Sequence, residues 1–129
     1  MCLHTEQSKP FTAGKDITCY KVVNPANMDG VFRSAFQEFA YSLGVKYVEK
    51  KFAKTVWSCT VHEGFHSYRT IDVARRHAFA LSPYVVLIKC VIPKGSMYYE
   101  SYTKEEYCSD TLIPVAWKPL WKCEWKTKP

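Results

Sequence analysis

The chain has 129 residues, of which 47% are hydrophobic and 16% aromatic, and its formal net charge is +6. This composition excludes a disordered polar chain, and the length fits one domain that buries a core without disulfide or metal staples. No apolar run approaches the roughly 20 residues of a membrane span, so no span is expected. The positive charge favours anionic partners such as nucleotides, nucleic acid or acidic surfaces, although it is also ordinary for a small domain.

The N-terminus and the cysteines both indicate a cytoplasmic protein. The opening residues lack the basic start and the apolar core of a signal peptide. Six cysteines, at positions 2, 19, 59, 90, 108 and 123, include no Cys-x-x-Cys pair. An even count could suggest disulfides, but without a secretion signal we expect reduced and mostly buried thiols. We expect the polar residues 1–15 to form a flexible N-terminal segment and residues 16–129 to form a single domain.

The first third of the chain predicts a strand followed by a helix. Residues 17–23 are rich in β-formers, and residues 24–30 carry the Pro, Asn and Asp-Gly of a turn. Ser34 then matches a helix cap, with Gln37 completing a capping box and Gly44 placed as the stop. Apolar residues recur at helical spacing between them: Phe36, Phe39, Ala40 and Leu43. The pattern predicts a first helix over residues 34–43.

The middle third predicts two strand segments, a loop and a second helix. Residues 45–54 alternate weakly, as in a lysine-rich edge strand, and residues 56–61 indicate a buried strand. Residues 64–69 are expected to form a loop. Thr70 then caps a helix with Asp72 in its first turn. The apolar stripe of that helix consists of Ile71, Ala74, Ala78 and Leu81.

The last third predicts three strands. Residues 84–92 contain the run Val-Val-Leu-Ile, typical of a central strand covered on both faces. A turn over residues 93–96 leads to a short strand over 97–102, and residues 112–117 form the last strand. The predicted fold class is α+β: one domain with a bent or split, mostly antiparallel sheet and two helices.

The pattern His62-Glu63-x-x-His66 supports one hypothesis of function. On a helix, its two histidines would share a face and bind zinc, while Glu63 activates water. Gly64 lies inside the pattern and costs about 1 kcal/mol in a helix, and the preceding residues are β-prone. We therefore favour ordinary loop histidines, and keep a zinc-dependent hydrolase using His62 and His66 as an alternative.

Three segments carry a resemblance to a family of small proteins of phages and gut bacteria with a Gly-Phe-His motif. They are Glu63-Gly64-Phe65-His66-Ser67-Tyr68 with the following Asp72-Val73-Ala74, the run from Val86 to Tyr99, and Cys108-Ser109-Asp110 with Leu112-Ile113-Pro114. The resemblance covers residues 17–115. It implies a phage-related protein of the host cytoplasm that binds a host signalling nucleotide, as an anti-defence factor would, or that blocks a host protein.

The same segments are also similar to the ADP-ribosyltransferase-like layout. Its elements correspond to Tyr20-Lys21, to Phe65-His66-Ser67 with the helix of Ala74, to Pro93-Lys94-Gly95, and to Cys108-Ser109-Asp110 before Leu112-Ile113-Pro114. The first element here lacks the Arg and Gly of that layout, and Asp110 stands at the position of the catalytic Glu. Because Asp110 is one methylene shorter, moving the carboxylate by about 1 Å is expected to cost on the order of 100-fold in rate. The resemblance thus implies a non-catalytic nucleotide pocket as readily as an enzyme with Asp110 as the catalytic candidate.

We therefore predict a small protein that binds a nucleotide-like or other anionic ligand without catalysis. In this hypothesis His66 hydrogen-bonds a ribose or phosphate, Arg69 pairs with phosphate, Tyr20 or Tyr98 stacks on a ring, and Asp110 accepts from a sugar hydroxyl. The proposed ligand-binding residues are Tyr20, His66, Ser67, Arg69, Tyr98 and Asp110. No cofactor is firmly implied; NAD or another nucleotide is the expected ligand, and zinc is not favoured.

Two further groups of residues suggest binding to anions. Arg75 and Arg76, with Arg69 and Lys89, would suit an anion site, although surface arginines need no such role. The C-terminus places Trp at every fourth position, each followed by Lys: Trp117, Lys118, Trp121, Lys122, Trp125 and Lys126. On a helix these would form paired stripes that suit nucleic acid or an acidic protein, which is a further alternative function. The other interpretation is a terminal segment that packs its Trp residues on the domain.

Overall fold

The computed structural model describes residues 3–34, 39–52, 56–57, 60–61, 63–78 and 84–129. Its strands in chain order are β1 (Leu3–His4), β2 (Phe11–Thr12), β3 (Ile17–Asn24), β4 (Phe32–Ser34), β5 (Ala40–Tyr41), β6 (Tyr47–Val48), β7 (Val56–Trp57), β8 (Thr60–Val61), β9 (Phe65–Tyr68), β10 (Val86–Ile92), β11 (Met97–Glu100), β12 (Glu106–Ser109) and β13 (Thr111–Pro119). The one α-helix in these ranges is α1 (Ile71–Ala78), which follows β9.

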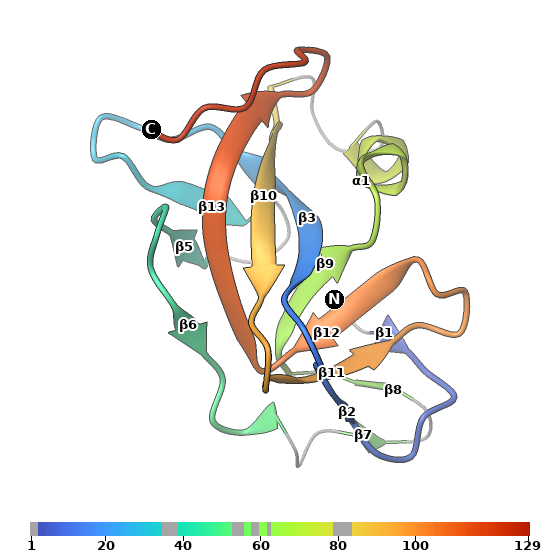
Figure 1. Ribbon diagram of the computed structural model, residues 1–129. Helices are drawn as coiled ribbons and strands as arrows, with labels where there is room; N and C mark the ends of the chain where they lie inside the picture. Colours follow the sequence, from blue (N-terminus) through green and yellow to red (C-terminus); the bar gives the residue numbers. More distant parts are fainter. Residues whose placement is uncertain (1–2, 35–38, 53–55, 58–59, 62, 79–83) are drawn as a thin grey trace.

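The main sheet is built around β10. Its strand order is β2-β11-β12-β9-β3-β10-β13-β6, with β4 and β5 added beside β3, and every pairing is antiparallel. β3, β10 and β13 lie side by side as long, bent ribbons in Figure 1. β1, β8 and β7 form a separate three-stranded sheet, and the described part of the main sheet does not close into a barrel. The α+β class and the mostly antiparallel sheet are confirmed.

The two faces of the main sheet bury different cores. On one face, Cys19 and Val23 of β3 pack with Ile88 and Cys90 of β10. On the other, apolar residues of β3 and β10 pack against α1: Val22, Leu87, Val73, Ala74 and Ala78. Successive side chains of a strand point to opposite faces, so the apolar run of β10 supplies both cores at once.

The predicted helix after Thr70 is confirmed. The Thr70 hydroxyl accepts a hydrogen bond from the backbone N–H of Val73 at 3.2 Å, which caps the first turn. The buried stripe consists of Val73, Ala74 and Ala78, and Asp72 stands in the first turn as expected. Leu81 lies outside the described residues. α1 covers the sheet beside β3 and β9 (Figure 1).

The predicted helix over residues 34–43 is wrong for the residues that the structure describes. Phe32–Ser34 and Ala40–Tyr41 are the paired strands β4 and β5, in which Phe32 lies opposite Tyr41. Phe39 and Tyr41 pack their rings 4.9 Å apart, beside the rings of Tyr47 and Phe65. Aromatic side chains suit a pleated, half-buried surface, so tertiary packing overrides the helical spacing here. Of the two predicted helices, the described residues contain only α1.

Three other segments differ from their predictions. The expected loop over residues 64–69 contains β9, and the expected strand over 56–61 contains β7 and β8, which pair with each other. The sequence did not predict β12, because only its two central residues, Tyr107 and Cys108, are buried and apolar, and its ends are polar. The N-terminal segment contributes β1, paired with β8, and β2, paired with β11.

Candidate functional site

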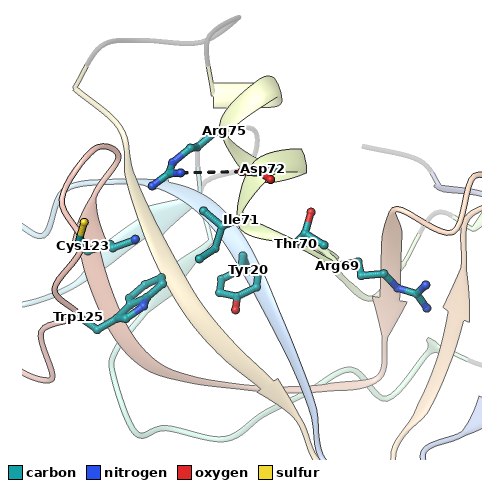
Figure 2. Close-up of a pocket in the computed structure, with 9 residues that line it drawn as sticks. Tyr20, Arg69, Thr70, Ile71, Asp72, Arg75, Cys123 and Trp125 are labelled. Carbon is teal, nitrogen blue, oxygen red and sulfur yellow. Dashed lines mark ion pairs between the residues drawn. The ribbon is translucent and has the colours of Figure 1, made fainter.

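An open pocket of about 540 Å³ lies where the first turn of α1 faces the C-terminal segment of the chain (Figure 2). It combines basic side chains with aromatic ones, and we call it the cationic pocket. Its lining residues are Tyr20, Arg69, Thr70, Ile71, Asp72, Arg75, Lys118, Cys123 and Trp125. They come from β3, the start of α1, the end of β13 and the segment beyond it. Residues far apart in sequence therefore meet at this pocket.

Strand alternation decides which side chains of the sheet reach the pocket. Tyr20 of β3 lies opposite Lys89 of β10, and Leu87 of β10 lies opposite Lys118 of β13. Because cross-strand partners share a face, these residues stand on the side of the sheet that α1 covers. Trp117, the neighbour of Lys118, points to the other face and contacts Phe32. The pocket floor thus follows from the register of three strands.

The segment after β13 turns back along the sheet and closes the pocket on one side. Trp117 and Lys126 exchange two backbone N–H to O hydrogen bonds of 2.8 Å, which return the chain to β13. Arg75 of α1 donates from Nε to the carbonyl oxygen of Leu120 at 2.9 Å. These bonds place Trp125 beside Tyr20, with ring centroids 5.9 Å apart and ring planes 25° from parallel.

Three cations gather at the tryptophans of this segment. The ammonium of Lys89 lies 4.6 Å from the centroid of the Trp125 ring, and that of Lys118 lies 4.8 Å from it. The guanidinium of Arg75 lies 5.4 Å from the ring centroid of Trp121. Cation–π contacts of this kind hold the cations in place but do not neutralise them.

Lys118 is the most unusual member of the pocket. Only 4% of its surface is exposed, although it lines the pocket. Burial lowers its pKa, and so do the nearby charges of Arg75 and Lys89. Among the described residues, no hydrogen-bond acceptor and no carboxylate is found for its ammonium. Because the Lys118 ammonium lies near the open side of the pocket, an anion that enters the pocket can reach it.

The acidic residue of the pocket does not offset these charges. Asp72 lies 4.0 Å from Arg75, and 93% of its side chain is exposed, so solvent screens the pair. Ile71 and Asp72 belong to the first turn of α1, where backbone N–H groups add partial positive charge. The site thus offers a positive wall, a helix N-terminus and the two rings of Tyr20 and Trp125. Such an arrangement can bind a flat, anionic molecule.

Arg69 lies at the border of the pocket and points away from it. Its Nε donates to the Tyr107 hydroxyl at 2.9 Å, and its Nη2 pairs with Glu100 at 2.9 Å. Figure 2 shows the guanidinium directed away from Tyr20 and Trp125. Arg76 likewise pairs with Glu105 at 2.9 Å. Of the four basic residues grouped in the sequence, the structure therefore brings only Arg75 and Lys89 to Lys118.

His66 and Ser67 lie in the interior rather than in the cationic pocket. His66 is partly buried, with Nε2 at 3.8 Å from the Cys108 sulfur, and its backbone oxygen accepts a hydrogen bond from Lys21. Burial, with the charge of Lys21, lowers the pKa of His66 to about 3, so the ring is neutral. Ser67 points to the opposite face of β9 and is 2% exposed.

Tyr98 and Asp110 lie toward the other end of the sheet. Tyr98 makes edge-to-face contacts with Phe11 and Tyr107, at centroid distances of 5.6 and 5.8 Å. Asp110 lies between β12 and β13, where its Oδ1 accepts from the backbone N–H of Met97 at 3.1 Å and from the Thr111 hydroxyl at 3.0 Å. Of the six proposed ligand-binding residues, Tyr20 and Arg69 line the cationic pocket, and the other four do not.

The histidine motif does not form a helical metal site in the part of the chain that is described. Glu63 and Gly64 form a bend, and His66 belongs to strand β9, while His62 lies outside the described residues. No group of three or more His, Cys, Asp or Glu side chains comes together among the described residues. Zinc therefore stays a hypothesis without support from geometry.

The Trp/Lys segment at the C-terminus is not helical. Trp117 and Lys118 belong to β13 and point to opposite faces, so the predicted paired stripes are absent from these described residues. Instead Trp125 enters the pocket, and Lys126 lies over the Trp117 ring at 5.0 Å. The sequence placed Lys118 and Trp125 in a separate module, whereas the fold joins them to Tyr20. Alternation along β13 was the signal that could have separated Lys118 from Trp117.

A second hollow, of about 780 Å³, lies over the loop of Ala26, Asn27, Met28 and Asp29. That loop alone lines it, and its one charged side chain, Asp29, already pairs with Arg33 at 3.0 Å. This hollow offers a ligand little that is buried or charged, so the cationic pocket is the better candidate.

Comparison with known proteins identified no relative of this chain. No protein-family model matches the chain, and neither the curated proteins nor the solved structures contain a significant match. In the described ranges, no helix has the length and apolar character needed to cross a membrane.

Proposed function

We propose that the protein binds a nucleotide-like anionic ligand in the cationic pocket and does so without catalysis. The observation that supports this most strongly is Lys118, which is 4% exposed and has only an aromatic ring as its partner among the described residues. An anion that reached Lys118 would supply the missing counter-charge. The resemblance to phage proteins would make a host signalling nucleotide a fitting ligand.

Charge favours a phosphate-bearing ligand over a neutral one. Lys118 and Arg75 line the pocket together, and Lys89 lies over the ring of Trp125. A phosphate placed between them would also face the first turn of α1, whose N–H groups favour anions. Both effects act in a partly buried site, where ionic attraction is stronger than in bulk water.

The aromatic side chains favour a ligand with a flat ring. Tyr20 and Trp125 present nearly parallel rings to the pocket. Stacking of a base on an aromatic side chain contributes about 1–3 kcal/mol. A nucleotide combines such a ring with phosphate, whereas inorganic phosphate or a nucleoside offers only one of the two.

A thermal-shift titration at low salt tests the proposal. The probes are AMP, ATP, cyclic nucleotides, NAD and ADP-ribose, with adenosine and inorganic phosphate as partial ligands. A ligand that binds only the folded protein raises the melting temperature by mass action. We expect a phosphorylated nucleotide to raise it and adenosine to leave it unchanged.

The variants Lys118→Met and Lys122→Met form a matched pair for this titration. Lys122 lies on the same segment, is exposed and does not line the pocket. Lys118→Met should weaken nucleotide binding at least about tenfold, because one close charge pair is lost in a partly buried site. Lys122→Met should bind as the parent protein does. Equal weakening in both variants, or no shift with any probe, would contradict the proposal.

A second candidate, an ADP-ribosyltransferase-like enzyme, is favoured by the arrangement of the strands. The four sequence segments of that layout lie on neighbouring elements: Tyr20-Lys21 on β3, Phe65-His66-Ser67 on β9, Pro93-Lys94-Gly95 after β10, and Cys108-Ser109 at the end of β12. In the sheet, β9 lies between β12 and β3, and β10 follows β3. Release of nicotinamide from NAD that Asp110→Ala abolishes would support this candidate over simple binding.

A further inference from the structure

The thiol of Cys123 differs from the other cysteines that the structure describes. Cys19, Cys90 and Cys108 are buried, whereas Cys123 is exposed. Burial raises the pKa of Cys19 and of Cys108 to about 12, and that of Cys90 well above its usual value, so these thiols are inert at neutral pH. Cys123 is therefore the accessible thiol among the four.

Cys123 lines the cationic pocket together with Lys118, Arg75 and Trp125. Figure 2 shows it beside Trp125 on the C-terminal segment, with Arg75 on the facing helix. A thiolate at Cys123 would act on Lys118 closely enough to raise the pKa of that ammonium. The buried Lys118, which lacks an acceptor in the described chain, is an independent sign that this place takes an anion.

We propose that Cys123 is a modification site selective for anionic disulfides, of which glutathione disulfide is the chemical type. The inference rests on the same pocket as the proposed function, but it needs only the charge of the pocket and not a nucleotide. Lys118 and Arg75 hold the carboxylates of the disulfide while its sulfur meets Cys123.

The reaction is a thiol–disulfide exchange. The Cys123 thiol loses its proton to solvent, and the thiolate attacks one sulfur of the disulfide. A new S–S bond joins Cys123 to one half of the reagent, the original S–S bond breaks, and the other half leaves as a thiolate. Cys123 is oxidised and the departing half is reduced, so no other oxidant is needed. The attached anionic group then lies against Lys118 and competes with any ligand of the pocket.

The test compares two disulfides of opposite charge on the full chain. The anionic probe is 5,5′-dithiobis(2-nitrobenzoate), and the cationic probe is cystamine. Each rate is measured at low salt for the folded protein and for the same protein in urea, and the rate of Cys123→Ser is subtracted. We expect the folded protein to prefer the anionic probe about tenfold more than the unfolded protein does, and salt to weaken that preference.

Two further measurements make the assignment specific. Peptide mapping by mass spectrometry should place the modification at Cys123; it also reports on Cys2 and Cys59, which lie outside the described residues. Lys118→Met should lose most of the charge preference, and Lys122→Met should keep it. Absence of modification at Cys123 in the folded protein, or a charge preference that is the same in urea or in Lys118→Met, overturns the inference.

The proposed function and this inference fail in different ways. Cys123→Ser should still bind a nucleotide, because the counter-charges of the pocket remain. Nucleotide binding without charge-selective modification overturns the inference alone. Charge-selective modification without binding of any nucleotide overturns the proposed function alone.

Discussion

Two polar clusters lie against the cores of this domain, and they differ in whether their charges are satisfied. The inner cluster, formed by Lys21, His66 and Cys108, is closed in the sense that its ammonium has an acceptor, because Lys21 donates to the His66 backbone oxygen. The Cys108 thiol donates to the carbonyl oxygen of Glu63 at 3.2 Å, while Nδ1 of His66 is buried and has no hydrogen-bond partner among the described residues. The cationic pocket is open, and its buried Lys118 has only the Trp125 ring for a partner among the described residues.

The contrast separates a structural role from a binding role. Lys21 and Lys118 expose similar fractions of their surface, 8% and 4%, but the ammonium of Lys21 lies deep in the protein, whereas that of Lys118 lies near the open side of its pocket. The difference is that Lys21 has an oxygen acceptor, whereas Lys118 lines an open pocket and has no acceptor among the described residues. A charged group whose acceptor is inside the fold stabilises the fold, and one that lines an open pocket without an acceptor can take its counter-charge from a ligand.

Crowding the inner cluster with an added methyl group should cause the largest loss of stability. Gly64 has φ of +122°, and a Cβ there would lie 2.6 Å from the Cys108 sulfur and 2.9 Å from the Phe52 ring. Both neighbours are buried, so neither can move away freely. We expect Gly64→Ala to lower the free energy of unfolding by about 3 kcal/mol, as measured by urea denaturation.

Gly44→Ala is the matched control for that substitution. Gly44 also has a positive φ, of +82°, but nothing lies within 4 Å of the place that a Cβ would take there. Only the backbone strain applies, so the loss should be about 1 kcal/mol. Equal losses at the two glycines would show that the packing around Cys108 is not tight.

Acid should weaken the inner cluster next. The pKa of His66 is lowered to about 3 in the folded protein from an ordinary value near 6.5. Between these values the unfolded state binds a proton that the folded state does not, so stability rises with pH across this window and falls as pH drops. From pH 7 to pH 5 we expect a loss of about 2 kcal/mol from this residue.

His66→Asn isolates this contribution from all other titrations. Urea denaturation of both proteins at pH 7 and pH 5 gives the difference in stability between them. That difference should shrink by about 2 kcal/mol at the lower pH, because the variant has no imidazole to protonate. An unchanged difference would mean that the His66 ring is accessible to protons in the folded state.

The smallest effect concerns the two lysines directly. Lys118→Met removes a charge that Arg75 and Lys89 repel, so we expect the free energy of unfolding to rise by less than about 1 kcal/mol at neutral pH. Lys21→Met removes a hydrogen bond to the His66 carbonyl and should lower it by about 1 kcal/mol. Denaturation in low salt measures both. Changes of the same sign would break the distinction between the closed and the open cluster.

The sequence predicted the parts of the fold whose local signals agree with their tertiary setting. β3, β10 and β13 are β-rich and buried, and α1 has a cap, an apolar stripe and an acidic first turn. The hairpin of β4 and β5 was missed because its aromatic residues also fit a helical spacing. The contact between the rings of Phe39 and Phe65 favours the hairpin over the helix, and local sequence patterns do not reveal this contact because the two residues lie far apart in the chain.

The candidate site was predictable only in fragments. The side chains of the site belong to separate sequence motifs, although each suits an anion or a flat ring: Tyr20, Arg75, Lys118 and Trp125. Their meeting depends on strand register and on the return of the chain after β13, neither of which has a local signature. Arg69 shows the converse, since its chemistry suits phosphate but its side chain is held by Tyr107 and Glu100.

The pocket walls come from near the start, the middle and the end of the chain. A molecule bound between Tyr20, α1 and Trp125 would therefore act as a reversible cross-link across the whole domain. It would add about 2.7 kcal/mol to global stability at one hundred times its dissociation constant. For a protein that works this way, the abundance of the ligand in the cell would help to set the lifetime of the protein itself.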